Sequence, residues 1–216
     1  MNFETSKNLG GIGAILMFIS VLPYLSTYTF GLLGLVGFIL LLVGMKGLAD
    51  YYREAGIFNN ALYGTITGIV GGVAFVAIIF TAVLGFMSNI VPSWNGDWAS
   101  LGQVNPADIT TNIDLSTIGP FLAAILVAFV VLFVFVLVVA ILYRKSLNSL
   151  REKSGVGLFG TAGTVLLVGA VLTIVFGLGL ILVWIAVLLV AIAFFQLRPQ
   201  QPAPPAPPPI EKPVQL

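Results

Sequence analysis

Residues 121–143 read FLAAILVAFVVLFVFVLVVAILY and contain no charged side chain, and Arg144 and Lys145 follow at once. The stretch belongs to one of four long uncharged runs, which cover residues 8–45, 55–96, 115–143 and 154–197. A charge at the centre of a bilayer costs about 2.5 to 3.5 kcal/mol, so lipid imposes such gaps on a sequence. The chain is also 59% hydrophobic and only 8% charged. The sequence therefore predicts an all-α integral membrane protein whose first partner is the lipid bilayer.

Two of the uncharged runs are too long for a single crossing. Residues 8–45 would extend about 57 Å as one helix, against a hydrocarbon core of about 30 Å. Turn residues divide both runs: Pro23, Ser26 and Thr27 in the first, and Phe176, Gly177 and Gly179 in the second. Within a single domain at 1–197 we predict six transmembrane helices as three hairpins, near residues 9–25, 29–45, 61–87, 119–143, 157–175 and 177–196.

Basic residues occur on only one side of these predicted spans. All nine lie on the side of the N-terminus: Lys7, Lys46, Arg53, Arg144, Lys145, Arg151, Lys153, Arg198 and Lys212. The loop at 88–118 holds Asp97, Asp108 and Asp114 and no basic residue. The positive-inside rule then predicts that both termini are cytoplasmic and that the 88–118 loop is extracellular.

Two connections on the basic side share a sequence pattern. The matching residues are Arg53, Glu54, Gly56, Leu62, Tyr63, Gly64 and Thr65 in one, and Arg151, Glu152, Gly155, Leu158, Phe159, Gly160 and Thr161 in the other. A fainter copy opens the first span at Leu9 and Gly11. Three parallel internal repeats are one reading of this pattern, and chance matches in low-complexity apolar sequence are the other.

Glycines recur at helical spacing in three of the predicted spans. They are Gly64, Gly68 and Gly72, then Gly157, Gly160 and Gly163, and then Gly31, Gly34 and Gly37. Small residues three or four positions apart allow helices to approach closely, so we interpret these glycines as packing surfaces. A hinge, or a lining that lets a solute approach the backbone, is the alternative. We expect the glycine-poor spans at 119–143 and 177–196 to face lipid.

The segment 47–60 has an apolar face and a charged face at helical spacing. Leu48, Tyr51, Tyr52 and Ala55 share the first, and Asp50, Arg53 and Glu54 lie mostly on the second. This pattern predicts a short helix in the plane of the membrane interface. Residues 146–153 repeat the pattern in miniature.

The segments MNFETSKNLGGIG at 1–13 and KGLADYYREAGIFNNAL at 46–62 resemble a mainly archaeal family of multi-span membrane proteins known as domain of unknown function 996. The resemblance covers about residues 1–197. It implies a plasma-membrane setting and brings no activity and no catalytic residues.

The side chains available for chemistry are few. The chain has no Cys and no His, which excludes thiolate chemistry and removes the commonest metal ligand and general base. The polar groups inside the spans are hydroxyls such as those of Ser20, Thr65, Thr81, Thr164 and Thr173, and each can bond to the carbonyl one turn back. With a net charge of +1 we expect no nucleic-acid partner. We expect no catalytic, cofactor or metal site.

The tail at 198–216 contains eight of the twelve prolines, so we expect it to be disordered and extended in the cytoplasm. Pro202, Pro205 and Pro208 have the PxxP spacing that aromatic-lined grooves bind. We therefore predict a non-enzymatic accessory or scaffolding subunit, with a Pro-rich docking tail, in a homo-oligomer or a larger membrane complex. The alternative is a channel or uniporter for a small neutral or apolar solute, lined by the first, third and fifth spans.

Overall fold

The computed structural model describes residues 1–21, 27–91, 94, 96–103, 115–173 and 177–199. These residues form six α-helices and one short 3₁₀ helix, without a β-strand. The helices are α1 Phe3–Ser20, α2 Thr27–Tyr52, α3 Ala55–Ile90, η1 Trp98–Gln103, α4 Leu115–Ser154, α5 Gly157–Leu172 and α6 Gly179–Gln196. The predicted all-α class is confirmed.

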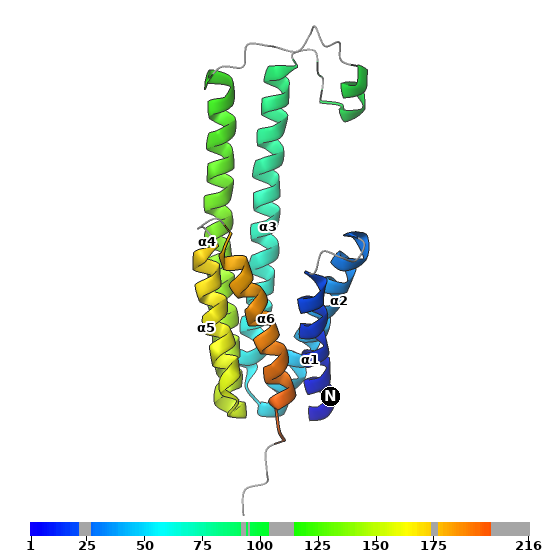
Figure 1. Cartoon of the computed structure of the whole chain (residues 1–216), viewed down its shortest axis with the longest axis vertical. Helices are drawn as coiled ribbons and strands as arrows, with labels where there is room; N and C mark the ends of the chain where they lie inside the picture. Colours follow the sequence, from blue (N-terminus) through cyan, green and yellow to red (C-terminus); the bar gives the residue numbers. More distant parts are fainter. Residues whose placement is uncertain (22–26, 92–93, 95, 104–114, 174–176, 200–216) are drawn as a thin grey trace, which may run out of the picture.

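The six α-helices form a ring in chain order. Each helix packs against the one before it and the one after it, and α6 closes the ring against α1. The N-terminus, the α2–α3 and α4–α5 connections and the last turn of α6 lie at one end, which we call the basal end (Figure 1). The α3–α4 hairpin projects well beyond the other four helices and carries η1 at the far end (Figure 1).

The helices differ greatly in length. Four of them, α2, α3, α4 and α6, are long and apolar enough to cross a membrane. At 36 and 40 residues, α3 and α4 extend about 54 and 60 Å, nearly twice a hydrocarbon core of about 30 Å. In contrast α5 has only 16 residues. The predicted turn at Pro23 and Ser26 lies outside the described residues.

The predicted interfacial helix over 47–60 is wrong. Instead, α2 continues to Tyr52 and α3 begins at Ala55, with Arg53 between them at a left-handed φ of 51°. The Glu54 N–H donates to the Ala49 carbonyl at 2.9 Å, which closes the turn. Leu48 and Tyr52 of the apolar face are buried against neighbouring helices rather than against lipid headgroups, whereas Tyr51 and Ala55 are exposed.

Large apolar side chains are buried together at the basal end. Leu48, Ile57, Leu150, Phe159 and Phe194 have no exposed surface and belong to one contact cluster. We call these five residues the basal core. The rings of Phe159 and Phe194 meet edge to face, with centroids 5.4 Å apart. The basal core therefore joins α2, α3, α4, α5 and α6.

Two polar contacts reinforce the basal core. The buried Ser146 hydroxyl on α4 donates to the backbone carbonyl of Ile57 on α3. Lys153 Nζ on α4 lies 3.2 Å from Glu54 Oε2 in the α2–α3 turn. Both contacts link the segment 146–153, which is the last part of α4 rather than a separate helix, to the start of α3.

The expectation that the last span faces lipid holds for one side of it, where Leu180, Ile181 and Ile185 are exposed, and not for the other. Helix α6 packs between α1 and α5 and buries 33% of its most apolar window, whereas the glycine-rich α3 buries only 6%. The reason is that Ala186, Ala191 and Ala193 on α6 are small enough to permit the close approach that we assigned to glycine alone. On α4 the outer half does carry exposed apolar side chains, among them Leu122 and Phe129.

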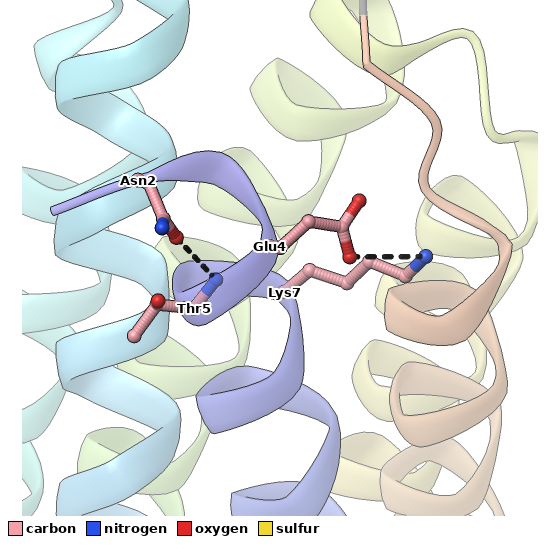
Figure 2. Close-up of polar contacts among 4 residues, drawn as sticks. All are labelled: Asn2, Glu4, Thr5 and Lys7. Atoms are coloured by element: carbon pink, nitrogen blue, oxygen red, sulfur yellow. Dashed lines mark hydrogen bonds and ion pairs between the residues drawn. The ribbon is translucent and has the colours of Figure 1, made fainter.

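Helix α1 begins with a side-chain cap. Asn2 Oδ1 accepts a hydrogen bond of 2.7 Å from the Thr5 backbone N–H (Figure 2). One turn along, Lys7 Nζ lies 4.0 Å from Glu4 Oε2 (Figure 2). The acidic Glu4 in the first turn also complements the positive end of the helix dipole.

We predict that Asn2→Ala lowers the free energy of unfolding by about 1 kcal/mol, because the Thr5 N–H loses its partner. Thermal unfolding in mild detergent measures the change. The control is Asn8→Ala, which replaces an exposed asparagine inside the same helix. Equal stability of the two variants would contradict the capping role.

Candidate functional site

The α1–α2 crossing brings two backbones into contact through glycine. A Cβ on Gly13 would lie 2.5 Å from the Gly37 carbonyl oxygen, and one on Gly44 would lie 2.5 Å from the Gly10 nitrogen. Of the glycines predicted on α2, Gly37 is part of this contact. Gly10, Gly13 and Gly44 were missed, although the seven-residue separation of Gly37 and Gly44 places them on one helix face.

The other two predicted glycines of α2 differ from each other. A Cβ on Gly34 would lie 2.8 Å from the Ser20 hydroxyl of α1. At Gly31 no described atom lies within 4 Å of the added carbon. The close approach of α1 and α2 therefore begins at Gly34 and continues toward the basal end.

The glycines of α3 face α4. A Cβ on Gly64 would lie 3.0 Å from the Tyr143 ring, and one on Gly68 would lie 3.6 Å from Val139 Cγ2, which is ordinary contact. Around Gly72 no described atom lies within 4 Å. The tightest position is Gly71, which sequence reasoning missed, at 2.5 Å from Phe135 Cβ. The neighbouring residues Gly71 and Gly72 therefore differ: Gly71 is packed against Phe135, and Gly72 borders open space.

The glycines of α5 lie against the charged end of α4. A Cβ on Gly160 would lie 2.6 Å from Arg151 Cδ, and one on Gly163 would lie 3.3 Å from Arg144 Cα. Gly157 has no described atom within 4 Å of its added carbon. Gly163 and Arg144 are therefore at the same height in the bundle.

A cavity of about 310 Å³ lies inside the ring, and all six α-helices contribute to its wall. The wall residues are Met17, Phe38, Leu41, Met45, Gly68, Gly71, Gly72, Leu132, Phe135, Val136, Val139, Ala140, Tyr143, Leu147, Ala162, Leu166, Ala170, Val183, Ala186, Val187 and Val190. We call this space the central cavity. The first, third and fifth spans, which were predicted to line a solute path, contribute to this wall together with α2, α4 and α6.

Tyr143 carries the only polar side-chain group in this wall, and that group is hydrogen-bonded. The Tyr143 hydroxyl lies 2.9 Å from Thr65 Oγ1. Since the Thr65 hydroxyl donates to the Ala61 carbonyl at 2.9 Å, Tyr143 is the donor in the pair. The central cavity thus presents hydrocarbon to anything inside it.

Hydroxyl groups in the helices bond to their own backbone, as predicted. Thr81 and Thr164 donate to the carbonyls four residues earlier, at 2.8 and 3.0 Å, and Thr173 does the same at 2.8 Å. The Ser20 hydroxyl bonds to the Met17 carbonyl at 2.7 Å. These hydroxyls are therefore already used within their own helices.

Other predicted candidates lie away from the cavity or outside the described residues. In the outer loop the rings of Trp94 and Trp98 lie 5.1 Å apart, and Trp94 Nε1 donates to the Asp97 carbonyl at 2.7 Å. Within the described residues no three carboxylates gather as a metal site would require. Asp108 and Asp114 fall outside the described residues, and so do Pro202, Pro205 and Pro208 of the predicted docking tail.

Long apolar helices around a hydrocarbon-lined cavity, with nearly all charges at one end, define a helical membrane protein. The chain belongs to the family described as "Protein of unknown function (DUF996)", which matches residues 33–188. It is similar to the uncharacterized protein MJ1644 of Methanocaldococcus jannaschii, with 24% identity over 198 residues, 91% of this chain and 94% of the relative. No solved structure matches it. The family resemblance predicted from the sequence is confirmed.

We predict opposite effects of Ala substitution at Gly71 and Gly72. Gly71→Ala forces Phe135 away from α3 and lowers stability by about 1 to 3 kcal/mol. Gly72→Ala meets open space and leaves stability unchanged or slightly raised, since Ala favours the helix. Thermal unfolding of the purified pair in the same detergent makes the comparison. A similar loss at both positions would show that the α3–α4 contact is not the one described.

Proposed function

We propose that this protein is a non-enzymatic accessory or scaffolding subunit of the cell membrane. The observation that supports it most is the shape of the α3–α4 hairpin, which projects beyond the other helices (Figure 1). Apolar side chains are exposed along this hairpin. Val76 and Phe80 on α3, and Val127 and Val134 on α4, are each more than half exposed. Such a surface suits the helices of a neighbouring subunit, in a homo-oligomer or a larger complex.

The chemistry of the interior supports a role without catalysis. The central cavity has an apolar wall, and its one hydroxyl pair, Tyr143 with Thr65, lacks an adjacent base or acid among the lining residues. General acid–base catalysis needs a titratable group within hydrogen-bond reach of a reacting atom. A packing and docking role makes no such demand.

We further propose that three hairpins enter the membrane from the cytoplasm, with both termini on that side of the plasma membrane. The support is that the described charged residues other than Asp97 all belong to the start of α1, the ends of α2 and α4, the α2–α3 turn and the residues after α6. These segments lie at the basal end (Figure 1). The six-span arrangement predicted from the sequence would require the α1–α2 and α5–α6 turns to reach the outer surface. With 16 residues α5 is too short for a full crossing, so we propose entry of the three hairpins from the cytoplasm and not six complete crossings.

This orientation predicts which residues a membrane-impermeant maleimide reaches. The natural chain has no Cys, so single cysteines report without background. Ala99→Cys in η1 should react from outside intact cells, and Glu152→Cys at the end of α4 only after the membrane is opened; both side chains are exposed. Reaction of both from the same side would overturn the orientation.

Docking through the tail predicts a partner that co-purifies in mild detergent and is lost when residues 199–216 are deleted. A full-length variant with Pro202, Pro204, Pro205 and Pro208 replaced by Ala leaves no two prolines three residues apart in the tail and is the matched test of the PxxP spacing. It should release the partner as the deletion does, because the polyproline II conformation is weakened. Isolation of the intact chain alone at every detergent strength would contradict the subunit role.

A second candidate function is a channel or uniporter for a small neutral or apolar solute, and the central cavity favours it. Gly68 lies in the cavity wall, so Gly68→Leu should abolish solute flux into liposomes if solute passes there. The matched control is Gly85→Leu on the same helix, where the added side chain meets open space outside that wall. Unchanged flux in a folded Gly68→Leu protein would remove this candidate.

A further inference from the structure

The central cavity needs an apolar occupant. Its volume of about 310 Å³ is roughly twice that of an engineered cavity, about 150 Å³, that stays dry and binds benzene. Water requires two to four polar partners, and the Tyr143 hydroxyl, the one polar side-chain group in the wall, already donates to Thr65. A hydrocarbon ligand fits this wall, and an aqueous solute does not.

The central cavity is closed at its basal side. Met45 and Leu147 belong to its wall, are nearly fully buried, and pack in the same cluster as the basal core. The Ser146–Ile57 hydrogen bond lies beside them on α4 and α3. An occupant therefore enters from the other direction, away from the charged end.

A second hollow continues from the central cavity along α4. It has a volume of about 450 Å³ and shares Leu132 and Val136 with the cavity wall. Its other side is formed by Thr173 and Gly177 of the α5–α6 turn, and its α4 side includes Leu126 and Phe129, which are 64% and 58% exposed. The second hollow thus connects the central cavity to the exposed surface of α4, next to the α5–α6 turn.

The height of the α5–α6 turn places this access route inside the bilayer. Gly163 lies level with Arg144, and the charges of Arg144 and Lys145 mark where hydrocarbon begins. From Gly163 to the end of α5 at Leu172 the helix rises about 14 Å, roughly half of a hydrocarbon core of about 30 Å. Beyond it, α4 continues alone with α3.

The turn itself has the chemistry of a segment surrounded by lipid. Its sequence from Thr173 to Gly179 is TIVFGLG, and the one hydroxyl donates to the Gly169 carbonyl at 2.8 Å. The Gly177 N–H donates to the Thr173 carbonyl at 3.2 Å, and the Leu180 N–H to the Gly177 carbonyl at 3.0 Å. Gly177 has φ of 72°, which favours glycine. The N–H groups of Gly177 and Leu180 are thus bonded within the protein, as hydrocarbon requires.

We propose that the central cavity is a binding site for the hydrocarbon chain of a membrane lipid, which reaches it from the bilayer over the α5–α6 turn. The ligand class follows from the apolar wall, the closed basal side and the depth of the turn. The lipid headgroup stays outside the ring, because no charged side chain lines the cavity. The site goes beyond the subunit role and does not depend on it.

The test uses the full-length protein reconstituted with a phospholipid that carries a photoreactive diazirine at the end of one acyl chain. After irradiation, peptide mapping should find the label on cavity residues Leu166 and Val183 as well as on the outer surface. Gly72→Leu fills the cavity from a position with open space around it, so the cavity label should be lost. Gly85→Leu, also in open space on α3, should retain it.

The access route is tested by one cysteine in the turn. Leu178 is 58% exposed, so the thiol of Leu178→Cys would lie in hydrocarbon, where it stays protonated. Because the thiolate is the form that reacts, maleimide should label this cysteine from neither side of intact vesicles and only after the protein is unfolded in SDS. Reaction with the impermeant reagent from outside would put the turn in water and overturn the route. Absence of label from Leu166 and Val183, or equal labelling of the cavity in Gly72→Leu and the unaltered protein, would overturn the site.

Discussion

The exclusion of charge from hydrocarbon is the constraint on which the rest of this structure depends. Because Arg144, Lys145 and Lys46 cannot enter lipid, the basal ends of α2 and α4 must leave it while remaining helical. These ends are in reach of water, where burying apolar surface is favourable. That is where the large side chains gather, in the basal core. The charges that fix the depth of the helices therefore also determine where the protein can form a conventional hydrophobic core.

Within the lipid a different principle holds the helices together. Lipid tails are as apolar as leucine, so association depends on close packing rather than on exclusion from water. The α1–α2 crossing at Gly13 and Gly37 and the insertion of Phe135 against Gly71 both provide such packing. Small residues also form part of the wall of the central cavity, among them Gly72, Ala162, Ala170 and Ala186, and a Cβ on Gly72 would meet open space. Small residues therefore permit tight pairs around the ring and also border the space at its centre.

The sequence predicted the helices well and their ends poorly. Charge-free runs identified all six helices, because lipid acts on composition over many residues. The sequence did not predict that α2 continues to Tyr52 and α4 to Ser154. The amphipathic pattern at 47–60 is compatible with burial against another helix as well as with a membrane surface. The glycine pattern located contacts at Gly64 and Gly37 but missed Gly71, because spacing along one helix does not say which turn meets a bulky partner. Alanine on α6 was overlooked for the same reason.

The closed basal side of the central cavity helps to distinguish a channel or uniporter from a subunit that binds lipid without transporting it. A path through the ring would have to separate Leu48, Leu150, Phe159 and their neighbours and expose them to water. At about 1.5 to 3 kcal/mol for each large apolar side chain, opening the basal core costs on the order of 10 kcal/mol, before the Ser146 hydrogen bond is lost. No charged group inside the ring is placed to drive that change by binding an ion or a proton. A cavity with a buried base and an adjoining hollow toward the bilayer is suited to holding what enters it, and this favours a packing and lipid-holding component over a carrier.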